Sequence, residues 1–325
     1  MSTEVYQAPQ LSMGRLFFLG LSSVILCVSF VMSVFAPFPL ALASVLYGRT
    51  KGLLVGVVGL LICLAVSIYG FKDFTLFAYY LGVFVMGLGM AEIAKRQMNP
   101  VKGILIIGFS LYAIIGLSVY SIVSQSGMNL EEFIVSHIDK NSEILVTQKK
   151  VIQESQQKDA IEILKVLDNP ALMAKELITA LPGYLFIGIF ISLWFNMFLI
   201  LKSRRLLLSA ETHEYTEKNL LNFKVPFGFV SLLVAGLVLV IWGTEMGWEH
   251  SEFVGFTILK CLGLFYFFQG FGVFSDLLNW LNVVGFFRTI IVMMVIFTAH
   301  YLIVVTGLFD NWFDFRKYFI KKIKE

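Results

Sequence analysis

Long stretches without charged residues recur along this chain and constrain its fold more than any other feature. A helix needs about 20 apolar residues to cross about 30 Å of hydrocarbon, and most of these stretches can do so once. The sequence is 58% hydrophobic and 14% charged, whereas a soluble domain carries about 25% charged residues. We therefore predict an all-α, polytopic transmembrane helical bundle of about eight or nine spans. The stretches are 16–48, 52–71, 74–91, 103–130, 177–201, 225–244, 253–275 (which holds one lysine) and 289–309.

Two prolines divide the first stretch. Residues 16–48 are too many for one straight span, and Pro37 and Pro39 lie within them. Proline lacks a backbone donor and clashes with the preceding turn, so we predict two helices, 16–35 and 40–48, with a break packed against protein. The stretch also exceeds the 7–15 apolar residues of a secretory signal, so we expect it to be retained.

Lysine and arginine cluster in alternate loops, which predicts the orientation of the spans. If the first stretch forms two spans, every basic cluster lies in the cytoplasm together with the N-terminal residues 1–15. The remaining loops are acidic or poor in basic residues, so we predict that 125–176 is an extracytoplasmic helical segment and 202–224 a cytoplasmic loop. The basic clusters are Arg49 and Lys51; Lys95, Arg96 and Lys102; and Lys202, Arg204, Arg205, Lys218 and Lys224.

The C-terminal helices, 225–309, and the basic amphipathic tail, 310–325, fit the charge rule less well. If each of the last two stretches crosses once, the tail lies outside although it carries Arg316 and four lysines. Three arrangements remain open. Residues 277–287 dip into the membrane, the last stretch forms a broken re-entrant pair, or the tail lies flat on the outer surface.

Polar side chains inside the apolar stretches are the candidates for a functional site. A polar or charged group in hydrocarbon usually faces a cavity or a partner, so His300, Asn196, Gln269 and Lys260 form a candidate intramembrane polar site. The alternative is structural. A neutral His300 then bonds a backbone carbonyl, Lys260 extends to the interface, and the two amides join helices.

Signatures of soluble enzymes are missing from the sequence. HExxH, GxSxG and the P-loop pattern do not occur, and His213 has no second histidine at metal-binding spacing. No basic stripe with interleaved aromatic residues suggests nucleic acid. We therefore expect no enzymatic activity, cofactor, metal site or nucleic-acid partner. Three cysteines lie in apolar stretches without a CxxC pattern and are expected to be buried hydrophobes: Cys27, Cys63 and Cys261.

Several short motifs occur together in this chain: Pro37-Phe-Pro39, Leu46-Tyr-Gly48-Arg-Thr-Lys-Gly52, Asn222-Phe-Lys-Val-Pro226, Gln269-Gly270, and the terminal Gly307-Leu-Phe-Asp310-Asn-Trp-Phe-Asp314-Phe-Arg316. With these motifs the chain resembles the YybS-like family of predicted bacterial membrane proteins, whose function is unknown. The terminal motif is the most specific of the set. The resemblance implies a multi-pass protein of the bacterial cytoplasmic membrane, with the lipid bilayer as its surroundings.

That family is similar in turn to the substrate-binding S components of energy-coupling-factor vitamin transporters. The resemblance implies an S-component-like six-helix core over 16–201, interrupted by the segment 125–176. Such a core captures a small molecule on the outer side and partners with a membrane-embedded coupling module. No signature of a particular vitamin class occurs in the sequence, so the ligand is not named.

A non-catalytic membrane scaffold is the alternative function. The rod-shape protein MreD has a core that looks similar, which implies interaction with other membrane proteins through the loop 202–224, the segment 125–176 or the tail. A cavity lined by the polar residues and open to the outer face would favour solute binding. A solidly packed bundle with an apolar groove would favour scaffolding.

Overall fold

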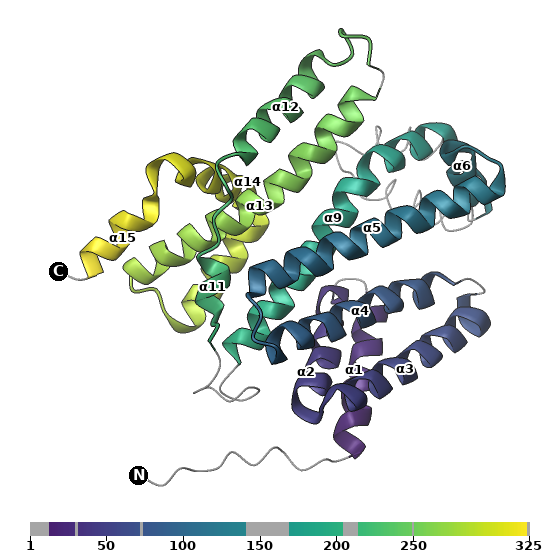
Figure 1. Cartoon of the computed structure of the whole chain (residues 1–325), viewed down its shortest axis with the longest axis horizontal. Helices are drawn as coiled ribbons and strands as arrows, with labels where there is room; N and C mark the ends of the chain where they lie inside the picture. The colour runs from purple at the N-terminus through teal and green to yellow at the C-terminus, as the bar shows by residue number, and fades with distance from the viewer. Residues whose placement is uncertain are drawn as a thin grey trace, which may run out of the picture. The chain divides into compact units, whose positions relative to one another are not determined.

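The computed structural model describes residues 13–29, 32–71, 74–140, 169–203, 214–248 and 250–323. Within these ranges the chain is helical and holds no strand, which confirms the predicted all-α fold (Figure 1). Three shorter apolar helices are α1 (Met13–Val28), 33–47, which joins η1 (Ser33–Phe35) to α2 (Pro37–Tyr47), and α12 (Phe229–Trp242). Six of the described helices are long and apolar enough to cross a membrane: α3 with its π-helical end (Arg49–Gly70), α4 (Thr75–Lys95), α5 (Pro100–Ser126), α9 (Pro170–Lys202), α13 (Ser251–Trp280) and α14 (Gly285–Phe313).

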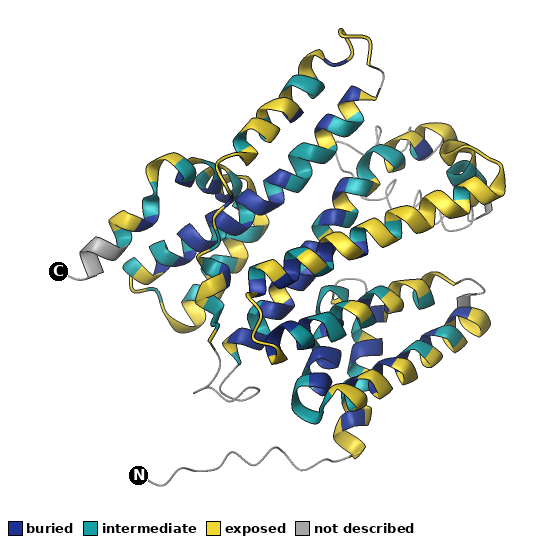
Figure 2. Ribbon diagram, viewed as in Figure 1, coloured by how far each residue is buried: buried dark blue, intermediate teal, exposed yellow. Residues whose placement is uncertain are grey.

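The chain divides into two compact units. The first consists of Met1–Leu111, Ile187–Phe229 and Leu262–Glu325, and the second of Tyr112–Phe186 and Val230–Cys261. Large parts of the long helices are exposed, as expected for surfaces that face lipid (Figure 2).

Helices α1 to α4 pack against one another within the first unit (Figure 1). Leu40, Cys63 and Tyr80 are completely buried in their shared core. Glycines allow this close packing, because a methyl group added at Gly59 would lie 2.0 Å from the Tyr80 hydroxyl oxygen. Small residues therefore permit the close van der Waals packing that holds helices together in lipid, where a hydrophobic driving force between helices is missing.

The proline break predicted in the first stretch is present, but it lies earlier in the sequence. Helix α1 ends at Val28, and α2 begins at Pro37 rather than after Pro39. Proline suits the first turn of a helix, where its missing N–H has no intrahelical partner and its fixed φ matches the helix. The prolines therefore start the second helix, and the irregular backbone precedes them.

Gly48 joins α2 to α3 in a tight turn. Its φ of +95° lies in the region that glycine tolerates and side chains rarely adopt. Four residues later, a methyl group at Gly52 would lie 1.8 Å from Ser44 Oγ, so only glycine lets α3 approach α2 this closely. The motif Gly48 to Gly52 is thus explained by backbone geometry.

Helix α14 bends sharply at Ala299, whose φ of −135° and ψ of 26° are not helical. Both sides of the bend contact the C-terminal half of α13. Arg288 donates to Ser275 Oγ at 2.7 Å, and a methyl group at Gly270 would lie 2.9 Å from the Gly307 nitrogen. A straight helix would separate Arg288 from Gly307 by about 28 Å, whereas their contacts on α13 are about 8 Å apart along its axis. Helix α14 is therefore not one straight membrane crossing, although its length and composition permit one.

In the second unit, α6 (Leu130–Lys140) follows α5 after a short turn. Asn129 caps it: Asn129 Oδ1 accepts from the Glu132 N–H, and Glu132 Oε2 accepts from the Asn129 N–H. This helix lies in the first part of the segment predicted at 125–176. Residues 141–168 lie outside the described ranges, and the side of the membrane stays a prediction.

Candidate functional site

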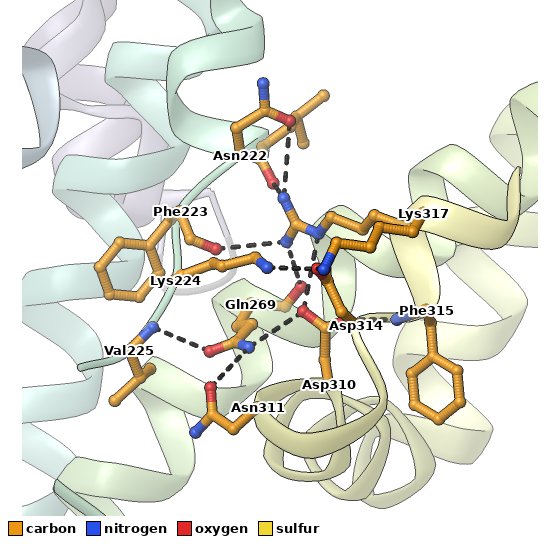
Figure 3. A network of polar contacts seen from close by, with 12 residues as sticks. Asn222, Phe223, Lys224, Val225, Gln269, Asp310, Asn311, Asp314, Phe315 and Lys317 are labelled. Atoms are coloured by element: carbon orange, nitrogen blue, oxygen red, sulfur yellow. Dashed lines mark hydrogen bonds and ion pairs between the residues drawn. The ribbon is translucent and has the colours of Figure 1, made fainter. Parts of the chain in front are cut away.

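A buried polar cluster joins four parts of the first unit (Figure 3). Its members come from the loop before α12, from the middle of α13, from the end of α14, and from α15 (Phe315–Ile323). We call it the arginine hub and define it as the backbone of 221–225 with the side chains of Gln269, Asp310, Asn311 and Arg316. Six of its hydrogen bonds are buried or partly buried.

Arg316 lies at the centre of the hub with its side chain only 6% exposed. Its guanidinium donates to the carbonyl oxygens of Leu221 at 2.8 Å, Phe223 at 3.2 Å and Gln269 at 3.0 Å. Its Nε lies 3.7 Å from Asp310 Oδ2, which makes an ion pair longer than a hydrogen bond. The planar fork of arginine therefore holds the loop and α13 together through three backbone carbonyls.

The Gln269 side chain uses both ends of its amide within the hub. Its Oε1 accepts from the Val225 N–H at 2.8 Å, and its Nε2 donates to Asp310 Oδ2 and Asn311 Oδ1, each at 3.0 Å (Figure 3). Gln269 is completely buried. Its donor and its acceptor are both satisfied by the chain itself, so it has little capacity left for a ligand.

Asp310 lies in the last turn of α14 and helps to turn the chain into α15. Its Oδ1 accepts from the Phe315 N–H at 2.9 Å. Between them Asp314 adopts the left-handed conformation with φ of 46°, which aspartate tolerates better than most residues. This reversal turns Arg316 back towards α13.

Asp314 forms an outer, more exposed part of the same junction. Its carboxylate accepts from Lys224 Nζ at 2.7 Å and lies 2.7 Å from Lys317 Nζ. These two lysines hold the pKa of the Asp314 carboxyl below its usual range. The ion pair with Lys224 links the loop to the tail a second time.

Glycines make room for the hub on α13. A methyl group at Gly272 would lie 2.0 Å from the Leu221 carbonyl oxygen and 2.6 Å from Arg316 Nη2. One at Gly270 would lie 1.9 Å from the Ile303 carbonyl oxygen, and one at Gly307 would lie 1.9 Å from that of Tyr266. These three glycines let the loop, α14 and α13 approach one another through backbone atoms.

A family of proteins described as "Predicted membrane protein (DUF2232)" matches residues 16–311 of the chain. The chain belongs to this family. No curated protein and no solved structure gives a match. The DUF2232 match runs from α1 through Asp310 and Asn311 and ends before Arg316, the residue at the centre of the hub.

In this DUF2232 protein three of the four candidate intramembrane polar residues, Asn196, Gln269 and His300, lie in the first unit, and Lys260 lies in the second. Only Gln269 belongs to the hub, and no hydrogen bond joins any two of the three in the first unit. Lys260 Nζ lies 4.6 Å from the centre of the Tyr184 ring. His300 is exposed, next to the bend of α14, with its ring 4.0 Å from that of Tyr301.

Asn196 is completely buried in α9 of the DUF2232 fold. Its Nδ2 donates to the carbonyl oxygens of Val34 at 2.7 Å and Ser192 at 2.6 Å, and so ties α9 to the break between α1 and α2. Its Oδ1 is buried and has no hydrogen-bond partner. Asn196 is therefore a structural contact with one unused acceptor.

The sequence of the DUF2232 chain marks Asp310, Asp314 and Arg316 as parts of one terminal motif but does not connect them with Gln269. The same motif contains Asn311, whose role, like that of the loop carbonyls, becomes visible only in the structure. Asn222-Phe-Lys-Val-Pro226 and Gln269-Gly270 were named as separate motifs, and the structure brings both to Arg316. The sequence signal that could have indicated the hub is Arg316 directly after an apolar stretch, together with the amide of Gln269 inside another one.

No group of three or more histidine, cysteine, aspartate or glutamate side chains in the described residues could hold a metal ion. A shallow apolar groove of about 400 Å³ lies between α1 and α2, lined by residues that include Arg15, Phe18, Leu46 and Tyr47. The chemistry of the hub is that of a structural junction, because its charged and amide groups are directed at backbone atoms of the same chain.

Proposed function

We propose that the chain is a non-catalytic scaffold of the bacterial cytoplasmic membrane, which presents a rigid cytoplasmic surface to another protein. The surface consists of residues 214–225, including the short helix α11 (Glu217–Leu221), beside the start of α15. The observation that carries the proposal is the arginine hub, which fixes this loop to α13 and α15 through buried hydrogen bonds.

Burying the polar groups of the hub costs free energy, which indicates that the geometry of the attached loop matters for function. Desolvating Arg316 and Asp310 opposes folding, and an apolar cluster of similar volume is often as stable as a buried ion pair. A buried polar network, however, specifies one arrangement of its parts. We infer that the loop must have a defined shape, which an interaction surface requires and a passive connection does not.

The loop itself is built to be rigid. Thr216 and Asn219 form a capping box at the start of α11, and Leu220 is completely buried beneath it. Lys218 and Asn219 remain exposed on its surface. A helix of this length is unstable alone, so its contacts with the hub and the core must hold it in place.

In vivo photocross-linking tests the proposal. A photoreactive amino acid in place of Lys218 should give discrete cross-linked protein bands. The same amino acid in place of Phe297, an exposed apolar residue of α14, should give none. Arg316→Gln should abolish the Lys218 bands while membrane insertion persists, whereas Lys102→Gln, a surface change elsewhere, should keep them. Absence of discrete bands at Lys218, or bands unaffected by Arg316→Gln, would contradict the scaffold proposal.

Solute binding by an S-component-like core, as in the YybS-like resemblance, is a second candidate function. It is favoured by Asn196, whose Oδ1 is a buried acceptor without a partner. Native mass spectrometry of the purified chain should then reveal a small molecule at stoichiometric amounts, and Asn196→Leu should release it while the folded yield persists. A chain free of bound solute under these conditions leaves the scaffold as the better supported function.

A further inference from the structure

The two ends of α14 contact the same half of α13. Arg288, near its start, contacts Ser275 near the end of α13, and Asp310, near its end, contacts Gln269 on the same half of α13. The bend at Ala299 makes this possible. Of the three arrangements left open by the sequence, this geometry favours a broken re-entrant pair.

The hub gives independent evidence for the position of the tail. Arg316, in the first turn of α15, donates to carbonyl oxygens of Leu221 and Phe223, and Lys224 pairs with Asp314. The tail therefore lies beside the loop that carries basic residues. With that loop in the cytoplasm, the lysines of the tail are there too, and the conflict with the charge rule disappears.

Helix α15 has one face directed at the protein and one directed away from it. Arg316 is buried in the hub, and the Phe319 ring lies 6.0 Å from that of Trp280. Lys317 and Tyr318 are exposed, with 80% of the Lys317 side chain accessible. In the sequence, Lys321 comes four residues after Lys317, and Lys322 comes four residues after Tyr318. Positions four residues apart share one side of a helix. Lys324 follows them.

Exposed aromatic residues precede this cationic face. Trp312 and Phe313, at the end of α14, are 50% and 57% exposed, and Tyr318 is 70% exposed. Aromatic rings favour the depth of the lipid headgroups, and a lysine-rich helix beside them is attracted to anionic lipids of the cytoplasmic leaflet. The charge of the lysines and the depth preferred by the aromatic rings therefore both indicate that the exposed face of α15 contacts an anionic lipid surface.

We propose that α15 lies on the cytoplasmic leaflet and binds anionic lipid headgroups. The re-entrant α14 returns the chain to this leaflet, where α15 begins. The contact goes beyond the proposed scaffold function and does not depend on it. Lysines supply a charge attraction that is not specific to one headgroup structure, and Trp312 and Tyr318 set the depth of the helix.

Photoreactive lipids test the proposal on the full chain in nanodiscs. Analogues of phosphatidylglycerol and phosphatidylcholine are compared, and labelled peptides are mapped by mass spectrometry. Peptide 315–325 should be labelled preferentially by the anionic lipid. Each lysine near an anionic surface favours binding about five-fold, so Lys321→Gln with Lys322→Gln should lower the preference by about 25-fold. Lys51→Gln with Lys102→Gln removes the same charge from other basic clusters and should leave the preference unchanged.

A sidedness experiment completes the test. Tyr318→Cys in a chain without its three native cysteines should be protected from an impermeant thiol reagent in intact cells and react after permeabilisation. Reaction in intact cells would overturn the proposal, as would equal labelling of the tail by the two lipids. Absence of lipid labelling of the tail would also overturn it, and would indicate that protein covers this face.

Discussion

The arginine fork, more than its charge, should determine the stability of the hub. Arg316 donates to three backbone carbonyls at 2.8–3.2 Å, whereas its ion pair with Asp310 is 3.7 Å long. Arg316→Lys keeps the charge but replaces a planar fork by a single ammonium, which cannot reach carbonyls on both the loop and α13. We expect Arg316→Lys to lower the free energy of unfolding by about 2 kcal/mol, since a hydrogen bond from a charged donor contributes about 1.5–3 kcal/mol.

Arg316→Gln should have a larger effect. It removes the three charged donors and leaves Asp310, which is 1% exposed, without its cation. Removing one partner of a buried pair costs about 3–5 kcal/mol. The unfolding of purified protein in mixed micelles of a mild detergent and dodecyl sulfate, followed by tryptophan fluorescence, would measure both variants.

Lys224→Gln is the matched control, because it removes a cation from the exposed part of the same junction. Its side chain is 48% exposed, so its pair with Asp314 should contribute no more than about 1 kcal/mol after screening by solvent. If the free energy of unfolding of Arg316→Lys lies within about 0.5 kcal/mol of that of the unmodified chain, then the fork geometry does not stabilise the hub and the charge alone does.

Further predictions concern other parts of the fold. Gly270→Ala should destabilise the folded chain by about 1–3 kcal/mol through overpacking, whereas Gly263→Ala on the same helix, with no atom within 4 Å of the new methyl group, should be tolerated in the same unfolding assay. His300→Leu should leave folded yield unchanged in detergent, because His300 is exposed; a loss of yield would place it in a packed contact. The Asp314 carboxyl has a lowered pKa in the folded chain, so its contribution to stability is complete above its ordinary pKa of about 4 and is lost as the pH falls through the lowered value. The decline in stability measured down to pH 3 should therefore be smaller in Asp314→Asn than in the unmodified chain.

The sequence predicted the membrane-spanning character and the helix break because both depend on local features. Apolar length and proline chemistry act over about one or two helical turns. The start of α2 at Pro37 rather than at position 40 reflects a competing preference, since proline both ends one helix and begins the next. Local signals thus predicted that the break exists and missed its position.

The arrangement of the polar residues could not be predicted in the same way. Gln269 and Arg316 are far apart in the sequence, and their contact depends on the bend at Ala299 and on the close approach at Gly270 and Gly307. Alanine gives no sequence signal of a bend, because it is the best helix former. His300, a candidate for the intramembrane polar site, lies midway along an apolar stretch, and in the structure it is exposed beside the bend.

The long sequence separation within the hub has a consequence for how the chain is made. Leu221 is synthesised 95 residues before Arg316, and α12, α13 and α14 are made in between. At ribosomal rates of about 5–20 residues per second, the carbonyls of the loop wait roughly 5–20 seconds for their donor. Until then water must satisfy them, which is possible only at the membrane surface. The loop is therefore expected to take its final shape last, after the helices on both sides of it have been inserted.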